Sequence, residues 1–161
     1  MQTIIRTPSK TIAVDIPYSR MKYPDVFWQK AFYFFWRICT PIHPFLRDLL
    51  LRLRIIRHVG RQEYPLGRID IDASLEPMIR DLVARGYGNH FVAWKDSDEL
   101  VSLRCTPDFE HQYHIRIFAD GEVRAHYEYT PECHPIRHMR EVGIEERRGE
   151  FLSLVKKYLI A

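Results

Sequence analysis

The sequence lacks the features that define several common protein classes. Its three cysteines, Cys39, Cys105 and Cys133, form an odd set with no disulfide-framework spacing, and no basic segment followed by an apolar run marks a secretory signal. No stretch approaches the roughly 18 uncharged apolar residues of a membrane-spanning helix, since Lys30 and Arg37 interrupt the most apolar segment. We therefore expect a cytoplasmic protein with reduced thiols and no transmembrane segment.

The chain also lacks the common nucleotide and metal motifs. It has no Walker loop, no G-x-G-x-x-G fingerprint and no G-x-S-x-G nucleophile elbow. His134 and His138 have i,i+4 spacing beside Cys133 and Glu132, but Pro135 starts a turn after His134, so the two rings need not converge. From this incomplete ligand pattern we expect neither a bound metal nor a cofactor.

The charges are divided unevenly along the chain. Residues 1–61 hold eleven Lys/Arg against three Asp, a net charge of +8, whereas the remaining residues carry −5. This asymmetry indicates either that the basic part faces an anionic partner or that the two parts dock on each other. At 161 residues and 46% hydrophobic composition, we expect one core, within an α+β two-layer domain at 63–161, preceded by a basic, aromatic-rich helical segment at 1–62.

Two helices are predicted in the basic segment, after an extended arm at 1–24 with at most one edge strand. The first begins at the N-cap Asp25 and continues to Cys39. Its surface is almost wholly apolar, so the helix must be buried, be shared with a partner or lie on lipid. Of these alternatives we expect burial. The second, Pro44–Val59, has an apolar face and an opposite basic face that is either solvated or bound to phosphate. The apolar face comprises Phe45, Leu46, Leu49, Leu50, Leu53 and Ile56, and the basic side comprises Arg47, Arg52, Arg54, Arg57, His58 and Arg61.

The remaining residues predict an α+β fold with a four-stranded antiparallel β-meander and helices packed on one face. The four strands are Phe91–Lys95, Glu99–Cys105, His111–Phe118 and Glu122–Tyr129. Before them come a short strand, Arg68–Asp72, and a helix from Leu75 to Arg85 capped by Ser74; a last helix spans Ile144–Leu159. The helical residues expected to face inward are Leu75, Met78, Ile79, Leu82, Phe151, Leu154, Val155 and Tyr158.

The loop between the last two strands determines how their residues pair. A three-residue loop, with Gly121 in the left-handed conformation, pairs Ile117 with Val123 and Ile115 with Ala125 on one face. A two-residue loop would mix apolar and charged side chains on both faces, so we predict the first register. Its polar face then pairs Arg116 with Arg124, His114 with His126, and Gln112 with Glu128.

The preceding strand extends this pattern if Cys105 lies opposite His111. Leu103 and Val101 then join the apolar face, and Ser102 and Arg104 lie on the polar face. The facing Arg116 and Arg124 repel each other unless an anion, or Glu122 and Glu128, compensates them. The polar face is therefore either a solvated sheet surface or an anion site, and the residues predicted to bind an anion are Arg104, Arg116, Arg124, His114, His126, Gln112, Arg54 and Arg57.

These features lead to three functional hypotheses. The first is a binding module for a phosphate-rich ligand, most simply nucleic acid, through the Arg/His face and the basic helix. The second is a small phosphoesterase- or nuclease-like enzyme that uses His114, His126 and Glu128, with Ser102 as the one candidate nucleophile. The third is a protein–protein adaptor, or self-association, through the aromatic helix at 26–38. Its contact residues would be Phe27, Phe32 and Phe35.

Overall fold

The computed structural model describes residues 2–21, 26–54, 63–89, 98–134, 137–138 and 143–160. Its main sheet has four antiparallel strands in the order β3-β6-β5-β4. Their bounds are β3 Tyr64–Arg68, β4 Glu99–Cys105, β5 His111–Phe118 and β6 Glu122–Tyr129. The predicted α+β class with a four-stranded antiparallel sheet is confirmed. The fourth described strand is β3 at the β6 edge, and the predicted strand Phe91–Lys95 lies outside the described residues.

The register predicted for the β5–β6 hairpin is confirmed. Gly121 has a φ of +85°. Ile117 pairs with Val123, and Arg116 pairs with Arg124. His114 with His126 and Gln112 with Glu128 follow on the same face as the arginines.

The register predicted between β4 and β5 is wrong by two residues. Cys105 lies opposite Tyr113 instead of His111, and Leu103 lies opposite Ile115. The connecting loop is wider than expected, and within it the Asp108 carboxylate accepts hydrogen bonds from the backbone N–H groups of Glu110 and His111. An offset of two residues leaves the side chains from Val101 to Cys105 on their predicted faces, so Ser102 and Arg104 still belong to the polar face.

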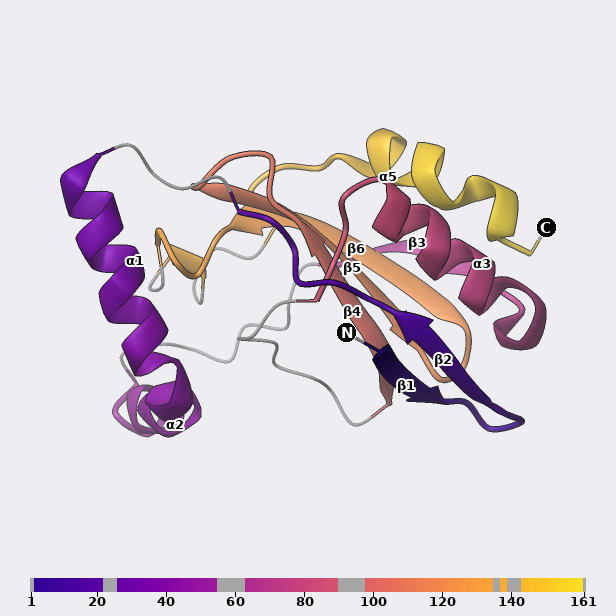
Figure 1. Cartoon of the computed structure of the whole chain (residues 1–161), viewed down its shortest axis with the longest axis horizontal. Helices are drawn as coiled ribbons and strands as arrows, with labels where there is room; N and C mark the ends of the chain where they lie inside the picture. Colours follow the sequence, from indigo (N-terminus) through magenta and orange to yellow (C-terminus); the bar gives the residue numbers. More distant parts are fainter. Residues whose placement is uncertain are drawn as a thin grey trace.

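Helices α3, Ile71–Ala84, and α5, Arg148–Val155, cover the apolar face of the sheet, and η2, Lys156–Tyr158, continues α5 (Figure 1). The buried residues of α3 are the predicted Leu75, Met78, Ile79 and Leu82, and those of α5 are Phe151 and Val155. Leu154 and Tyr158 are only partly buried.

Two predicted boundaries near α3 are wrong for one reason. Asp70 caps the helix by accepting hydrogen bonds from the backbone N–H groups of Asp72 and Ala73, so α3 begins at Ile71 and not after Ser74. The strand expected at 68–72 therefore lies earlier, as β3. The last helix is shorter than predicted, because α5 begins only at Arg148.

The N-terminal residues form a hairpin rather than the predicted extended arm. Strands β1, Gln2–Arg6, and β2, Thr11–Asp15, pair antiparallel. Their alternation places one side of the hairpin in the core, where Ile5, Ile12 and Val14, followed by Ile16, are buried with residues of the main sheet. One hydrophobic core thus contains residues from both segments distinguished in the sequence.

Helices α1, Phe27–Cys39, and α2, His43–Arg52, are joined by η1, Thr40–Ile42, at the side of the molecule (Figure 1). The second helix ends earlier than predicted: Leu53 caps it, Arg54 has a φ of +57°, and the predicted extension continues into residues outside the described ones. The burial expected for the first helix is wrong for its described apolar side chains, since Phe27, Trp28, Phe34, Phe35 and Ile38 are exposed while α3, α5 and the β1–β2 hairpin cover the core. None of the described helices is long and apolar enough to cross a membrane.

Candidate functional site

The polar face of the sheet is buried, contrary to the solvated surface considered from the sequence. The structure brings together Arg104, Gln112, His114, Arg116, His126 and Glu128, all of them buried. Arg124 belongs to the same face but is 38% exposed, Arg54 is exposed beyond the end of α2, and Arg57 lies outside the described residues. The predicted face therefore exists as a polar network inside the protein, and buried polar groups must find partners there.

Arg104 is held by internal partners at one end of this network. Its guanidinium forms a two-pronged ion pair with Glu132, at 2.8 and 3.1 Å, and donates to Gln112 at 3.2 Å. Nε donates to Ser19 at 2.8 Å. Glu132, which the sequence suggested only as a neighbour of the Cys133 and His134 pair, is thus the counter-ion of a buried arginine.

Arg116 and Arg124 are compensated by three carboxylates at the other end of the network. Arg116, 1% exposed, donates to both Glu63 and Glu99. Arg124 donates to Glu122 and lies 3.7 Å from Glu63. Glu122 was one of the two compensating residues predicted, whereas Glu128 takes part in a different cluster.

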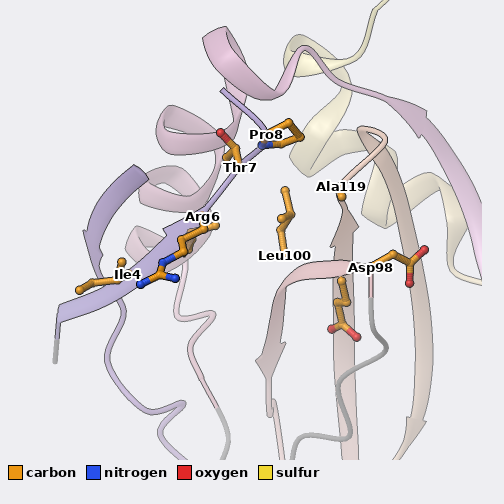
Figure 2. Close-up of a pocket in the computed structure, with 9 residues that line it drawn as sticks. Ile4, Arg6, Thr7, Pro8, Asp98, Leu100 and Ala119 are labelled. Atoms are coloured by element: carbon orange, nitrogen blue, oxygen red, sulfur yellow. The ribbon is translucent and has the colours of Figure 1, made fainter. Parts of the chain in front are cut away.

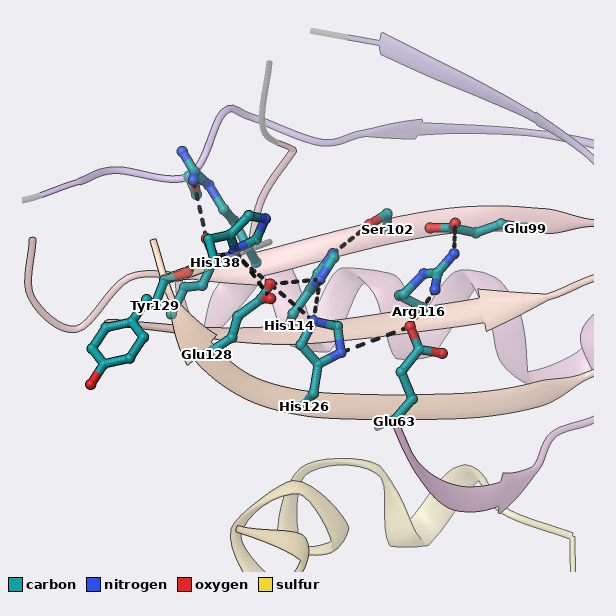
Figure 3. Close-up of polar contacts among 12 residues, drawn as sticks. Glu63, Glu99, Ser102, His114, Arg116, His126, Glu128, Tyr129 and His138 are labelled. Carbon is teal, nitrogen blue, oxygen red and sulfur yellow. Dashed lines mark hydrogen bonds and ion pairs between the residues drawn. The ribbon is translucent and has the colours of Figure 1, made fainter. Parts of the chain in front are cut away.

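That cluster consists of His114, His126 and Glu128, which bring two ring nitrogens and one carboxylate oxygen close together (Figure 3). His126 Nε2 lies 3.0 Å from His114 Nδ1 and 2.9 Å from Glu128 Oε1. His114 Nδ1 lies 3.4 Å from the same carboxylate oxygen. The predicted cross-strand pairing of the two histidines, with Glu128 two residues further along β6, produces this triangle.

A second layer of polar atoms surrounds the triangle. Ser102 Oγ lies 2.6 Å from His114 Nε2, and Gln112 Nε2 donates to Glu128 Oε1 at 2.6 Å. His126 Nδ1 faces Glu63 Oε1 at 3.9 Å. At the far side of the carboxylate, His138 Nδ1 lies 3.2 Å from Glu128 Oε2 (Figure 3).

The Glu128 carboxyl is held as an anion in this setting. Burial alone would raise its pKa, but the charges of His126 and His138, with hydrogen bonds from His114 and His126, outweigh burial and hold the pKa well below its usual range. A buried carboxylate that faces two imidazole nitrogens is an arrangement suited to a cation.

The His134 and His138 pair contacts two different carboxylates. His134 Nε2 lies 2.8 Å from Glu110 Oε1, while His138 is directed at Glu128 and at the backbone oxygen of Tyr129, 2.9 Å from Nδ1. Sequence spacing indicated this pair, yet the cluster that the structure assembles joins residues of two strands, which only the hairpin register reveals.

A hollow of about 620 Å³ lies between the turn of the β1–β2 hairpin and the start of β4 (Figure 2). Its lining includes Arg6, Thr7, Asp98 and Leu100. Glu99 also lines it and connects it to the polar network through Arg116.

Comparisons of the chain with protein-family models, with curated proteins and with solved structures find no match. A functional conclusion therefore depends on the geometry of the polar network.

Proposed function

We propose that the protein binds a divalent transition-metal ion through His114 Nδ1, His126 Nε2 and Glu128 Oε1. The observation that carries this proposal is the triangle of these atoms, with sides of 2.9, 3.0 and 3.4 Å. A tetrahedral Zn²⁺ with nitrogen and oxygen ligands about 2.0–2.1 Å away holds its ligand atoms roughly 3.3 Å apart. The side chains are thus spaced almost as such an ion would require.

The outer nitrogen of the His114 ring supports the same proposal. A metal ligand nitrogen carries no proton, so the N–H of a neutral imidazole must be on the other nitrogen. For His114 that nitrogen lies 2.6 Å from Ser102 Oγ, whereas for His126 it lies 3.9 Å from Glu63 Oε1, too far for a hydrogen bond. Metal-binding histidines are commonly oriented by an oxygen acceptor such as the one that Ser102 provides.

The chemical types of the three ligand atoms favour some metal ions over others. Two imidazoles and one carboxylate suit Zn²⁺, Fe²⁺ and related first-row ions better than Mg²⁺ or Ca²⁺, which prefer oxygen ligands. Three protein ligands leave a position for water or a substrate atom, as in catalytic zinc sites, where the ion acts as a Lewis acid. The enzyme hypothesis drawn from the sequence uses the same three residues, and we retain it within this proposal.

Metal content and thermal unfolding test the proposal together. The protein, stripped with chelator and titrated with Zn²⁺, should bind one ion per chain and unfold at a higher temperature, because the ion binds the folded state. His126→Ala should abolish both effects. Co²⁺ in place of Zn²⁺ should give a visible absorption spectrum that depends on His114 and Glu128.

His134→Ala is the matched control, since this half-buried imidazole also faces a carboxylate but lies outside the triangle. It should keep the stoichiometry and the temperature shift. If the chain binds no ion, or if His126→Ala binds Zn²⁺ as the wild type does, the cluster is only a buried hydrogen-bond network.

A serine-based relay is a second candidate, favoured by the 2.6 Å contact between Ser102 Oγ and His114 Nε2. With Glu128 Oε1 3.4 Å from Nδ1 of the same ring, these atoms have the order of a nucleophile, a base and an orienting acid. Ser102→Ala separates the candidates. It should lower metal affinity by about 10–100-fold if Ser102 orients a ligand, whereas labelling of Ser102 by a fluorophosphonate would support the relay.

Binding of a phosphate-rich ligand stays a prediction. The basic N-terminal segment and the exposed Arg54 support it. At the sheet face, however, Arg104 and Arg116 already donate to buried carboxylates, so a phosphate there would have to displace Glu132 or Glu63 and Glu99. Single-stranded oligonucleotide binding that weakens steeply with salt, and weakens further in Arg54→Glu, would support the hypothesis for the N-terminal segment.

A further inference from the structure

Helices α1 and α2 expose a broad apolar surface. On α1, large apolar side chains recur at helical spacing on one face, and further exposed apolar side chains follow on η1 and α2. We define the α1–α2 apolar surface as Phe27, Trp28, Phe34, Phe35, Ile38, Ile42, Phe45, Leu46, Leu49 and Leu53. Trp28 and Phe45 are each 77% exposed. Soluble monomers rarely expose so many neighbouring apolar side chains unless the surface has a binding role.

The orientation of α1 explains why these side chains are exposed. Tyr33 is half-buried, and its ring lies 6.2 Å from the ring of Phe109, next to the main sheet. Two helical residues further on, a side chain is turned by about 200°, so Phe35 points away from that contact. Through Tyr33, helix α1 therefore contacts the described part of the main sheet's surroundings on the face opposite its exposed apolar side chains.

The charges beside this surface are mostly positive. Residues 26–54 carry five Lys/Arg against one Asp, a net charge of +4. Lys30 lies four residues before Phe34, and Arg37 lies three residues after it. Arg52 lies three residues after Leu49, and all three cationic side chains are exposed. The apolar face is thus bordered by cations at the positions where lipid phosphates meet an interfacial helix.

We propose that the α1–α2 apolar surface docks onto an anionic lipid bilayer. Its aromatic and aliphatic side chains enter the boundary between headgroups and acyl chains, while Lys30, Arg37 and Arg52 contact the phosphates. At 13 residues α1 is about 20 Å long, too short for a bilayer core of about 30 Å, so it lies in the interface plane. Docking onto a second copy is disfavoured, because that contact would bring two surfaces of charge +4 together.

Sedimentation with two kinds of vesicle tests this proposal. One kind is pure phosphatidylcholine and the other contains about 30% phosphatidylserine, which gives a negative surface potential. The full chain should bind the acidic vesicles at least about tenfold more tightly than the neutral ones. Phe34→Ser with Phe35→Ser should abolish binding, and Lys30→Glu with Arg37→Glu should weaken it about tenfold or more per reversed charge.

Matched variants elsewhere on the surface provide the controls. Ile160→Ser removes another exposed apolar side chain, and Arg148→Glu with Lys156→Glu makes the same change in net charge away from α1. Both should bind as the wild type does, and all variants should keep the wild-type melting temperature. Failure of the wild type to bind acidic vesicles overturns the proposal, as does equal loss of binding in the controls. A concentration-dependent dimer that Phe34→Ser with Phe35→Ser dissociates, without vesicle binding, would assign the surface to a second copy instead.

Discussion

At Gly121 the chain turns from β5 into β6 with a φ of +85°, a conformation that L-residues with a side chain rarely adopt. A second constraint comes from packing, because a Cβ at this position would lie 2.5 Å from the backbone oxygen of Ile69. The same two residues are joined by a hydrogen bond from Ile69 N to Gly121 O of 2.9 Å. The turn therefore holds the hairpin against the connection from β3 to α3.

Gly121→Ala should destabilise the protein by about 1–3 kcal/mol because of the positive φ. The close contact between the new Cβ and Ile69 should add to this cost. Gly149→Ala is the matched control, because it lies in α5 with no heavy atom within 4 Å of its Cβ position. That variant should be neutral or gain about 0.5–1 kcal/mol from helix propensity. Urea denaturation of the two variants measures both effects, and equal stability would contradict this account of the turn.

The thiol of Cys133 provides a second prediction at this scale. Burial raises its pKa to about 11, with the negative charges of Glu110, Asp108 and Glu132 acting in the same direction. Since only the thiolate reacts, alkylation at pH 8 should be about 100-fold slower in the folded protein than in urea. The folded-state rate should rise about tenfold per pH unit toward pH 11. Mass spectrometry of peptides containing Cys133 would show this, and a pH-independent rate would contradict it.

The sequence predicted some of the site residues and missed others for identifiable reasons. His114, His126 and Glu128 could be placed on one face because the hairpin loop and the alternation of side chains agree on a single register. Glu99 could not, since strict alternation puts it on the apolar face with Val101. An irregularity between Glu99 and Val101 in the β4–β5 pairing lets it reach Arg116 instead.

At the level of the elements, the two facing arginines of β5 and β6 differ in their surroundings. Arg116 is surrounded by buried carboxylates, whereas Arg124 is 38% exposed and also lies over the Phe118 ring, 4.4 Å from its centroid. Arg116→Ala should cost about 3–5 kcal/mol, because it leaves Glu63 and Glu99 buried without their cation. Arg124→Ala should change stability by no more than about 1 kcal/mol.

Neutralising the carboxylates that lose their arginine tests why Arg116→Ala should cost more stability than Arg124→Ala. Replacing Arg116 by Met, with Glu63→Gln and Glu99→Gln in the same chain, should recover part of the lost stability, since a neutral set avoids uncompensated buried charge. Chemical denaturation compares the variants. Equal stability of Arg116→Ala and Arg124→Ala would show that the buried ion pairs contribute nothing.

Element identity was easier to predict than element boundaries. The hairpin, α1 and the inward face of α3 follow directly from periodicity. The start of α3 did not, because both Asp70 and Ser74 are good N-caps, and only the packing of Ile69 beside Gly121 and Leu159 selects Asp70. Burial of α1 was inferred from its apolar surface alone, and the sequence did not reveal that other elements already cover the core.

On the scale of the whole molecule, the N-terminal β1–β2 hairpin is part of the main core. The β1–β2 hairpin contributes Ile5, Ile12 and Val14, with Ile16 following, and its turn is tied to α3 through bonds from Ser9 and Lys10 to Asp72. Proline content suggested an extended arm, because proline cannot donate to a strand ladder, but the prolines at positions 8 and 17 flank β2 and lie outside the ladder. A contact between segments so far apart in the chain leaves no local signal in the sequence.

This shared core predicts that the hairpin and the main sheet unfold together. Ile16→Ala removes a fully buried side chain and should destabilise the protein by about 2–5 kcal/mol, whereas Ile4→Ala, in a 65% exposed position, should change stability by about 0.5 kcal/mol or less. In Ile16→Ala, amide exchange should accelerate equally in β2 and in the central strands β5 and β6, because loss of one contact lowers the stability of the whole cooperative unit. Faster exchange confined to β1 and β2, with β5 and β6 unchanged, would mean that the hairpin opens independently and that 63–161 folds without it.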